Sequence, residues 1–574
     1  MPQLNDALDQ PHPITHAPGR TTSFTLFFIL LCALAVTVLA TVVNLKLSAL
    51  YNWRYTSDLF VIDTMLQETL RGRFMMEYTY GCQFGDHACL ILLLGIPIKA
   101  LLARHMVVFL VMVSPALLLL SSAILFTATR AIAGTGWALF ATFCYFLSVG
   151  VIHGPFEFTW GFHIDTGSGF VAVAMAALFL CRDEAHSVAW ASRPCTSPPR
   201  SNLLTNTSLT TVAFYALMKE EMALLGAFFF AFLLLFKRDR LHIASLILCI
   251  LIFATEILVT RLCRTPWNRT NEALVRDLLT FFREQGITGF LFSREKAQYW
   301  LVIIGMIVAM AGCIYAARRF NRFALGLFLI GLAKHAFAWS SKDFDLWAWH
   351  NYPALVMLTG GIILQSLELR HLNLSADTMR LRLTTAALVV ASLIWFLSME
   401  IPYALQQHQR NVLAYQRAIP YKPAMRDLQK RIDKSKVISV PLYSLVEWTD
   451  GYRYGFFPGG ITWNVMGVAD YAVSLRTEGP EELPQLEVFR LLYQNSRYRL
   501  WVRKGYLPGE LESRQKFIQL FGPDSIGQHP RPKTNKKKRK HAPASSVAWA
   551  SRPCALLMHG RDAHATQLTQ RAGS

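Results

Sequence analysis

The sequence has few charged residues and lacks the short motifs of several enzyme classes. Charged residues make up 16% of its 574 residues, against about 25% in an average soluble chain. The ten cysteines show no zinc-ligand spacing, and there is no glycine-rich phosphate loop and no serine-nucleophile elbow. The sequence therefore points to no cofactor, and it leaves a divalent metal requirement open.

Apolar residues take the place of the missing charges. They make up 53% of the chain, and a run of about 20 can cross a bilayer. We predict an all-α polytopic membrane protein of about eleven spans, followed by a small α/β soluble domain. The runs cover residues 24–44, 106–129, 134–152, 167–181, 205–219, 222–236, 241–260, 299–317, 320–334, 353–368 and 384–404. The apolar segment Ala88–Leu102 contains Pro97 and Lys99 and is predicted not to cross.

Basic clusters predict the orientation. Lys237 to Arg240, Arg318 to Arg322 and Arg370 to Arg382 alternate correctly with the spans if all three are cytoplasmic. The first run has no cleavage site and reads as an uncleaved span. Residues 1–23 are then cytoplasmic, and the loop over 45–105 lies outside. The chain is predicted to be a multi-pass protein of the bacterial cytoplasmic membrane.

Composition divides the rest of the chain. Residues 24–404 form the predicted membrane domain, and residues 405–528 the extracytoplasmic α/β domain. A helix over Met425–Asp433 and strands over 436–440, 469–475 and 498–502 are expected there. The peptide SVAWASRPC occurs twice, within an insert at 183–204 and within a basic tail at 529–574. Both segments are predicted to lack regular structure.

The net charge of +20 does not indicate nucleic-acid binding. Ten basic residues against one acidic residue lie in the tail, and the other basic residues fall in short loops between spans. We expect membrane lipid as a partner and no nucleic acid. Cys82 and Cys89 flank an acidic loop; free thiols are the favoured interpretation, and a disulfide bond between them is the alternative.

Ionisable side chains gather beside the spans, on the predicted outer face. Such groups are costly near hydrocarbon, which favours a functional role. The candidates are Asp58, Asp63, Glu68, Arg73, Asp86, His87, Glu157, His163, Asp165, Lys219, Glu220, Glu221 and His350.

Each candidate also has a structural interpretation. Asp58 would serve as a general base or would cap a helix beginning at Leu59. Lys219 would contact phosphate or pair locally with Glu220 or Glu221. Asp63 is interpreted as a solvated residue, and His163 is more often an interfacial histidine than a catalytic one.

The segment YTSDLFVIDTMLQETLRGRF, with Gly85-Asp86-His87, Gly161-Phe162-His163 and Met218-Lys219-Glu220-Glu221, resembles the domain of unknown function 2079 family of bacterial membrane proteins. The resemblance covers roughly residues 25–510 and rests on the order and spacing of the motifs. That family is similar to the type-C glycosyltransferases, which use polyprenyl-phosphate-linked sugars. Two departures from the pattern are Phe60, where glycine is usual, and Glu221 at the end of its motif.

The resemblance implies roles for individual residues. Asp58 would occupy the position of the catalytic carboxylate. Lys219 would match a basic residue that binds the lipid phosphate, with Arg73 as a further phosphate partner. Glu220, His87 and His163 would contact or orient the substrate.

The sequence thus predicts a membrane glycosyltransferase that takes a sugar from a polyprenyl-phosphate donor at the outer face. The alternative is a transporter or lipid-handling protein without transferase activity. The charged residues beside the spans favour this alternative. No repeated half of the kind seen in inverted-repeat transporters is evident, which favours the enzyme.

Overall fold

The computed structural model describes most of the predicted membrane domain and much of the domain after it. The described residues are 19–55, 57–78, 81–85, 87–148, 150–156, 162–191, 199–266, 283, 294–338, 352–372, 378–457, 468–476, 488–506 and 509–522.

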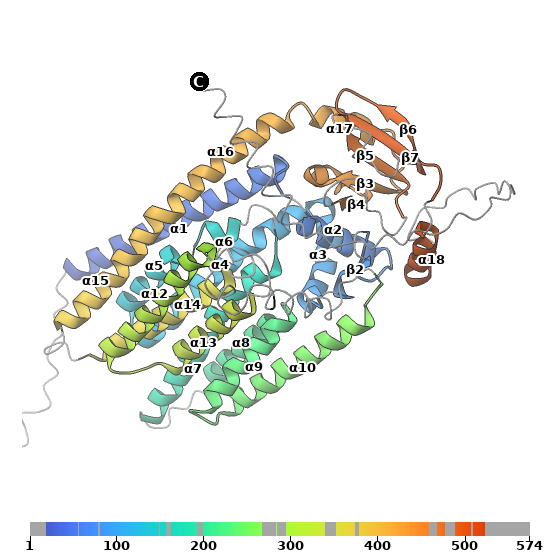
Figure 1. The fold of residues 1–574 in the computed structure, drawn as a ribbon. Coiled ribbons are helices and arrows are strands. Elements are labelled where there is room, and N and C mark those ends of the chain that lie inside the picture. Colours follow the sequence, from blue (N-terminus) through green and yellow to red (C-terminus); the bar gives the residue numbers. More distant parts are fainter. Residues whose placement is uncertain are drawn as a thin grey trace, which may run out of the picture.

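Helices form at all eleven apolar runs, which confirms the mainly helical polytopic prediction (Figure 1). They are α1 (Gly19–Tyr51), α4 (Met106–Ala133), α5 (Thr135–Ser148), α7 (Ile164–Ala191), α8 (Pro199–Ala216), α9 (Glu220–Leu234), α10 (Arg240–Leu262), α12 (Arg294–Ala317), α13 (Arg322–Ala338), α14 (Tyr352–Ser366) and α15 (Thr378–Trp395).

Fewer of these helices than predicted are long and apolar enough to cross a bilayer. Within the described residues there are six, which begin in α1, before α4, and in α7, α10, α14 and α15. Helices α5, α9 and α13 have 14, 15 and 17 residues. At 1.5 Å per residue they are shorter than the roughly 30 Å hydrocarbon layer. The remaining apolar helices stay predicted spans, because the six meet a criterion of length and composition among the described residues alone.

The segment before α4 folds as predicted. It forms a 3₁₀ turn (Leu90–Leu94) and the short helix α3 (Gly95–Leu102). The chain then breaks at Ala103, whose φ of 46° lies in the left-handed region. The eight residues of α3 extend about 12 Å, which is less than the hydrocarbon layer, and the absence of a crossing here stays a prediction.

Helix α14 is the centre of the bundle, and every one of its residues is buried. It packs against α7 and α13 through glycines. A Cβ at Gly169 would lie 2.8 Å from the Pro353 carbonyl oxygen, and one at Gly361 would lie 2.9 Å from that of Ala324. Small residues at these positions let the helix backbones approach closely, as in membrane helix pairs generally.

One end of the bundle carries ion pairs between basic and acidic loop residues. At the end of α7, Arg182 binds Asp239 at 2.9 Å and Glu184 binds Arg370 at 2.7 Å. Between them, Asp183 binds both Lys237 and Arg322. These pairs hold together the three basic clusters that the sequence analysis assigned to the cytoplasmic face. We call this the basic end.

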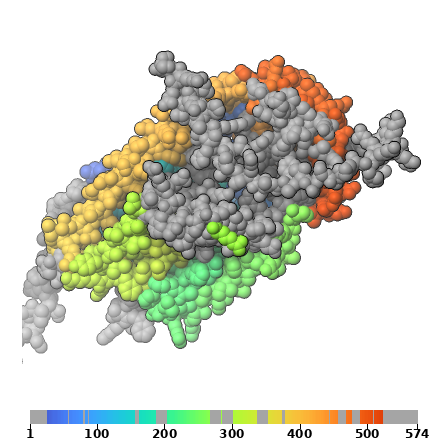
Figure 2. Space-filling model, viewed as in Figure 1, coloured from blue at the N-terminus to red at the C-terminus, as the bar shows by residue number. Residues whose placement is uncertain are grey.

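The last span continues beyond the predicted membrane boundary. Helix α15, a π-helical turn (Phe396–Glu400) and α16 (Ile401–Ala418) follow without a break. This run lies along α1 and leads to the C-terminal sheet (Figure 1). Figure 2 shows that it forms one long edge of the molecule, opposite α10.

The C-terminal region is a mixed sheet with short helices. The strands are β3 (Val437–Pro441), β4 (Arg453–Phe457), β5 (Tyr471–Leu475), β6 (Phe489–Gln494) and β7 (Tyr498–Arg503), in the order β4-β3-β5-β7-β6. Strand β3 is parallel to β4 and β5, whereas β7 is antiparallel to β5 and β6. With α17 (Lys422–Gln429) and α18 (Glu510–Phe521), they form the predicted small α/β unit. The expected strands at 436–440, 469–475 and 498–502 are confirmed.

The first outer loop is folded between the bundle and this sheet. It contains α2 (Ser57–Leu70) and a hairpin of β1 (Met76–Glu77) and β2 (Gly81–Cys82). The insert at 183–204 was predicted to lack regular structure. In the structure, α7 continues through part of it to Ala191, into the first copy of the repeated peptide. The second copy and the basic tail lie outside the described residues.

Candidate functional site

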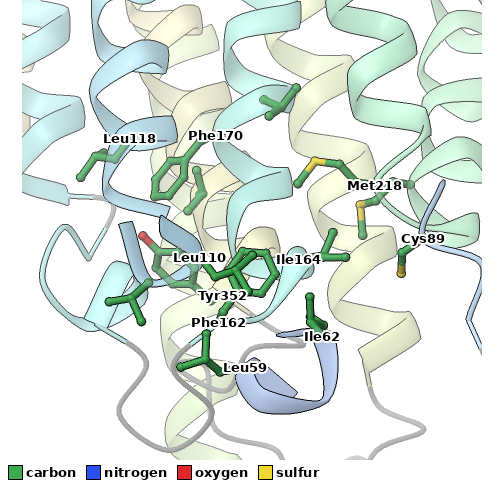
Figure 3. Packing of buried hydrophobic residues seen from close by; sticks show 14 of the residues in the cluster. Leu59, Ile62, Cys89, Leu110, Leu118, Phe162, Ile164, Phe170, Met218 and Tyr352 are labelled. Atoms are coloured by element: carbon green, nitrogen blue, oxygen red, sulfur yellow. The ribbon is translucent and has the colours of Figure 1, made fainter. Parts of the chain in front are cut away.

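Asp58 is the second residue of α2, at the corner between α1 and α2. Two elements from the far end of the chain hold this corner. Arg54 donates to Gln407 on α16 at 2.7 Å, and Trp53 donates to Glu447 at 3.0 Å. On the other side, Leu59 and Ile62 pack against the ends of the bundle helices, next to Phe162 and Ile164 (Figure 3). The Asp58 side chain keeps 35% of its surface exposed.

His163 is the nearest titratable neighbour of Asp58. Its Nε2 lies 3.5 Å from Asp58 Oδ2. Its Nδ1 accepts from the backbone N–H of Asp165 at 3.4 Å, which assigns the proton to Nε2. Burial lowers the pKa of His163 to about 3. At neutral pH the imidazole therefore presents a neutral N–H toward the carboxylate, and it orients Asp58 without forming an ion pair.

A quartet of charges lies beneath this pair, with three members buried and Glu221 25% exposed. Lys219 Nζ is 3.0 Å from Asp165 Oδ2 and 3.3 Å from Glu221 Oε1. Lys334 binds Glu221 closely and lies 3.9 Å from Asp165 Oδ2. Asp165 also lies 3.8 Å from His163 Nδ1, so the quartet connects to Asp58 through the imidazole. Two cations and two anions balance here, as buried charges require.

Three helix beginnings explain why the acidic groups gather. Asp58 is in the first turn of α2, Asp165 in that of α7, and Glu220 and Glu221 in that of α9. The positive end of a helix dipole stabilises a carboxylate in the first turn. Lys219 immediately precedes α9, where the carboxylates outweigh its burial and raise its pKa above the ordinary value.

His87 and Glu220 form a second, more exposed pair. His87 Nδ1 lies 2.7 Å from Glu220 Oε1, and 49% of the His87 side chain is exposed. Glu220 follows Lys219 directly, which places this pair beside the quartet. The structure therefore brings together five of the six predicted site residues, namely Asp58, His87, His163, Lys219 and Glu220.

Arg73 follows the end of α2 that is far from Asp58. It binds Glu68, and its Nε is 2.6 Å from Glu68 Oε2. Arg71 binds the same carboxylate. Glu68 is in the last turn of α2, about 15 Å along the helix from Asp58 at 1.5 Å per residue. No contact of Arg73 with the Asp58 cluster occurs in the described part of the chain, and its role as a phosphate partner remains a prediction.

Asp63 corrects one expectation. It was interpreted as a solvated residue, but it is fully buried, and Lys99 donates to its Oδ1 at 2.7 Å. The pair joins α2 to α3. The earlier interpretation was wrong because the compensating cation lies 36 positions along the chain, beyond the reach of local pattern.

The sequence analysis missed two buried members of the site. Lys334, near the end of α13, completes the quartet, and a single lysine within an apolar run was the available signal. Glu256 on α10 is fully buried and interacts electrostatically with Glu220. Asp86, Glu157 and His350 lie outside the described residues.

The cluster as a whole is acidic. Four carboxylates (Asp58, Asp165, Glu220 and Glu221) face two lysines (Lys219 and Lys334), so the carboxylates outnumber the ammonium groups by two. Asp58 and His87 are its most exposed members. The arrangement can accept a proton at Asp58 and hold hydroxyl groups beside it.

The chain is similar to several solved structures at low identity. ArnT from Cupriavidus metallidurans bound to undecaprenyl phosphate is 12% identical, with a TM-score of 0.45 over 83% of this chain and 98% of that chain. The Archaeoglobus fulgidus oligosaccharyltransferase in complex with Zn and sulfate is 13% identical, with a TM-score of 0.41 over 77% of this chain and 67% of that chain. Scores this low do not establish a shared fold. No family model and no curated protein matches the chain.

Proposed function

We propose that this protein is a membrane glycosyltransferase that moves a sugar from a polyprenyl-phosphate donor to an acceptor hydroxyl at the outer face of the cytoplasmic membrane. The observation that carries the proposal is the meeting of Asp58, His163 and Lys219, three residues from separate segments, in one connected cluster. The donor class comes from the resemblance of the sequence motifs.

In the proposed reaction Asp58 is the general base. Its carboxylate takes the proton from the acceptor hydroxyl as that oxygen attacks the anomeric carbon of the sugar. The bond from that carbon to the phosphate oxygen breaks, and the polyprenyl phosphate leaves with both electrons. His163 orients the carboxylate through Nε2–H.

Lys219 has two proposed contributions. Its ammonium group holds Asp165, which lies next to His163, and so it positions the base. As the sequence analysis predicts, it would also stabilise charge on the departing phosphate. Because Lys219 is only 5% exposed and already binds two carboxylates, phosphate contact requires one of these pairs to open.

The orientation of the chain supports an outer-face reaction. Asp165 begins α7, and Asp183 lies 18 residues later on the same helix, about 27 Å away. The Asp58 cluster and the basic end are therefore on opposite sides of the bundle. With basic loops in the cytoplasm, the cluster and the C-terminal sheet face outward.

Asp58→Asn tests the catalytic role. Because the side chain stays nearly isosteric and Asp58 lies inside the first turn of α2, past the cap position, fold and lipid binding are expected to persist. Turnover with a panel of polyprenyl-phosphate-linked sugars is expected to fall about 100-fold or more, the range for a lost general base. Full activity in this variant would remove Asp58 from the mechanism. An intact wild type that moves substrate across vesicles without transferring sugar would favour the transporter instead.

Asp450→Cys tests the orientation. The Asp450 side chain is 68% exposed and lies next to the C-terminal sheet, so a cysteine there is accessible without disturbing the core. A membrane-impermeant maleimide added to intact spheroplasts is expected to label it. Labelling only after the membrane is opened would reverse the orientation.

A further inference from the structure

Two cysteines from distant segments meet beside the candidate site. Cys82 lies in β2, and Cys263 directly follows α10 as its C-cap residue. The two thiols lie within interaction distance of each other. The 3₁₀ turn that follows β2 (Gln83–Gly85) packs against α10, so the two segments are in contact beyond the cysteines themselves.

The other cysteine of this loop has different neighbours. Cys89 is buried at the start of the 3₁₀ turn before α3, in the electrostatic neighbourhood of Glu220 and Lys219. Cys82 interacts with Cys263, whereas the loop sequence suggested Cys89 as its partner.

The two thiols differ in exposure. Cys263 is the more exposed of the two, since Cys82 keeps only 3% of its surface. The thiolate is the nucleophile in disulfide exchange, and Cys263 is the thiol that an external oxidant reaches first.

We propose that Cys82 and Cys263 form a disulfide bond that joins the first outer loop to the outer end of α10. The Cys263 thiolate attacks the disulfide of a thiol oxidant and forms a mixed disulfide. Cys82 then loses its proton and attacks the Cys263 sulfur, which displaces the second oxidant thiolate. Two protein thiols are oxidised, and the oxidant disulfide is reduced to two thiols.

The compartment supports this chemistry. In the orientation given above, both cysteines lie on the outer face of the membrane, where disulfides form and persist. The bond has a direct consequence for the site, because His87 is five residues after Cys82 and binds Glu220. A disulfide at Cys82 limits how far this histidine can move from the start of α9.

Thiol mapping of the full-length protein tests the bond. Membranes are dissolved in denaturant with N-ethylmaleimide, reduced, and treated with a second, heavier maleimide. In the wild type, Cys82 and Cys263 are expected to carry the second label, and Cys89 the first. Peptide mass spectrometry before reduction should find the segment after Arg73 joined to the Cys263 peptide, two hydrogens lighter than the sum.

Single variants provide the matched controls. In Cys82→Ser, Cys263 should move to the first label, and in Cys263→Ser, Cys82 should do so. Cys89→Ser should leave the pair unchanged. First-label modification of both cysteines in the wild type, or a reducible pair that contains Cys89, would overturn the proposal. The wild-type map decides the question even if a variant fails to fold.

Discussion

The two ends of the helical bundle both carry ion pairs but use them differently. At the basic end, each pair joins a loop to the last turns of α7, and its members remain partly exposed, such as Lys237 at 45% and Asp183 at 24%. At the Asp58 end, Asp165 and Lys334 are 0% and 1% exposed, although their partner Glu221 is 25% exposed. Exposed pairs contribute little to stability, whereas removing one partner of a buried pair is costly. The basic end therefore tolerates substitution, and the site end does not.

Lys334→Met should reveal the largest difference between the ends. It leaves Asp165 and Glu221 with one cation in place of two, and a buried uncompensated charge costs about 3–5 kcal/mol. Lys237→Met at the basic end is the matched control, with an expected loss of about 0–1 kcal/mol. Denaturant unfolding in detergent measures both. Equal losses of stability in the two variants would contradict the expected difference between the two ends.

Acid should loosen the site end first. The pKa of His163 is about 3 in the folded protein, against 6.5 ordinarily. Below about pH 6.5 the unfolded chain binds a proton that the folded chain does not, so stability falls as the pH drops toward 3. The loss at about pH 4 should be of the order of 2–3 kcal/mol.

His163→Gln should flatten this dependence, as stability measured from about pH 4 to pH 7 would reveal. The wild-type turnover profile should show no His163 limb between about pH 5 and pH 8. A limb near pH 6.5 that disappears in His163→Gln would mean that the imidazole is charged during turnover.

The smallest effect is expected at Asp239 on the basic end. The hydrogen bond from Arg182 helps lower its pKa to about 2 against burial. A carboxylate with a lowered pKa stabilises the fold above its ordinary pKa of 3.8, and this stability is lost as the pH falls through about 2. Acid sensitivity at this end thus begins more than two pH units below that of His163.

Two substitutions separate the roles of Asp239. Its Oδ1 accepts from the Leu241 N–H at 2.8 Å, which caps α10. Asp239→Asn keeps the cap and should cost about 1 kcal/mol or less through the partly exposed Arg182 pair. Asp239→Ala also loses the cap, at about 1 kcal/mol more. Identical stability of the two variants would show that the cap contributes nothing.

The sequence predicted the helices well because apolar runs are a local signal. All eleven runs became helices, and the break before α4 was expected from Pro97 and Lys99. The length of α16 was not predicted, because beyond Leu405 the helix is polar and its contacts are with α1 and the Arg54 corner. Apolar runs predict helices only within the membrane domain, so they gave no sign of the polar part of α16.

Most of the site was also within reach of the sequence, since the acidic groups follow directly on spans. Pairing was not. Lys99 compensates Asp63, and Lys334 completes the quartet around Asp165, each from a distant segment. The partner of Cys82 was missed for the same reason. The sequence shows which charged residues and cysteines are present, but only the tertiary structure shows which of them pair with each other.

The uninterrupted helix from Thr378 to Ala418 has a mechanical consequence. Its 41 residues extend about 60 Å. Its first half exposes apolar side chains such as Leu383 and Ile394, and its second half contacts Arg54 at the α1–α2 corner. A bilayer thinner or thicker than the apolar part makes a helix tilt. In this protein, a tilt of α15 would be transmitted along α16 and would shift the α1–α2 corner that carries Asp58. We expect turnover in reconstituted vesicles to pass through a maximum as the acyl chains are lengthened, with lipid thickness acting as a tuning parameter for the geometry of the base.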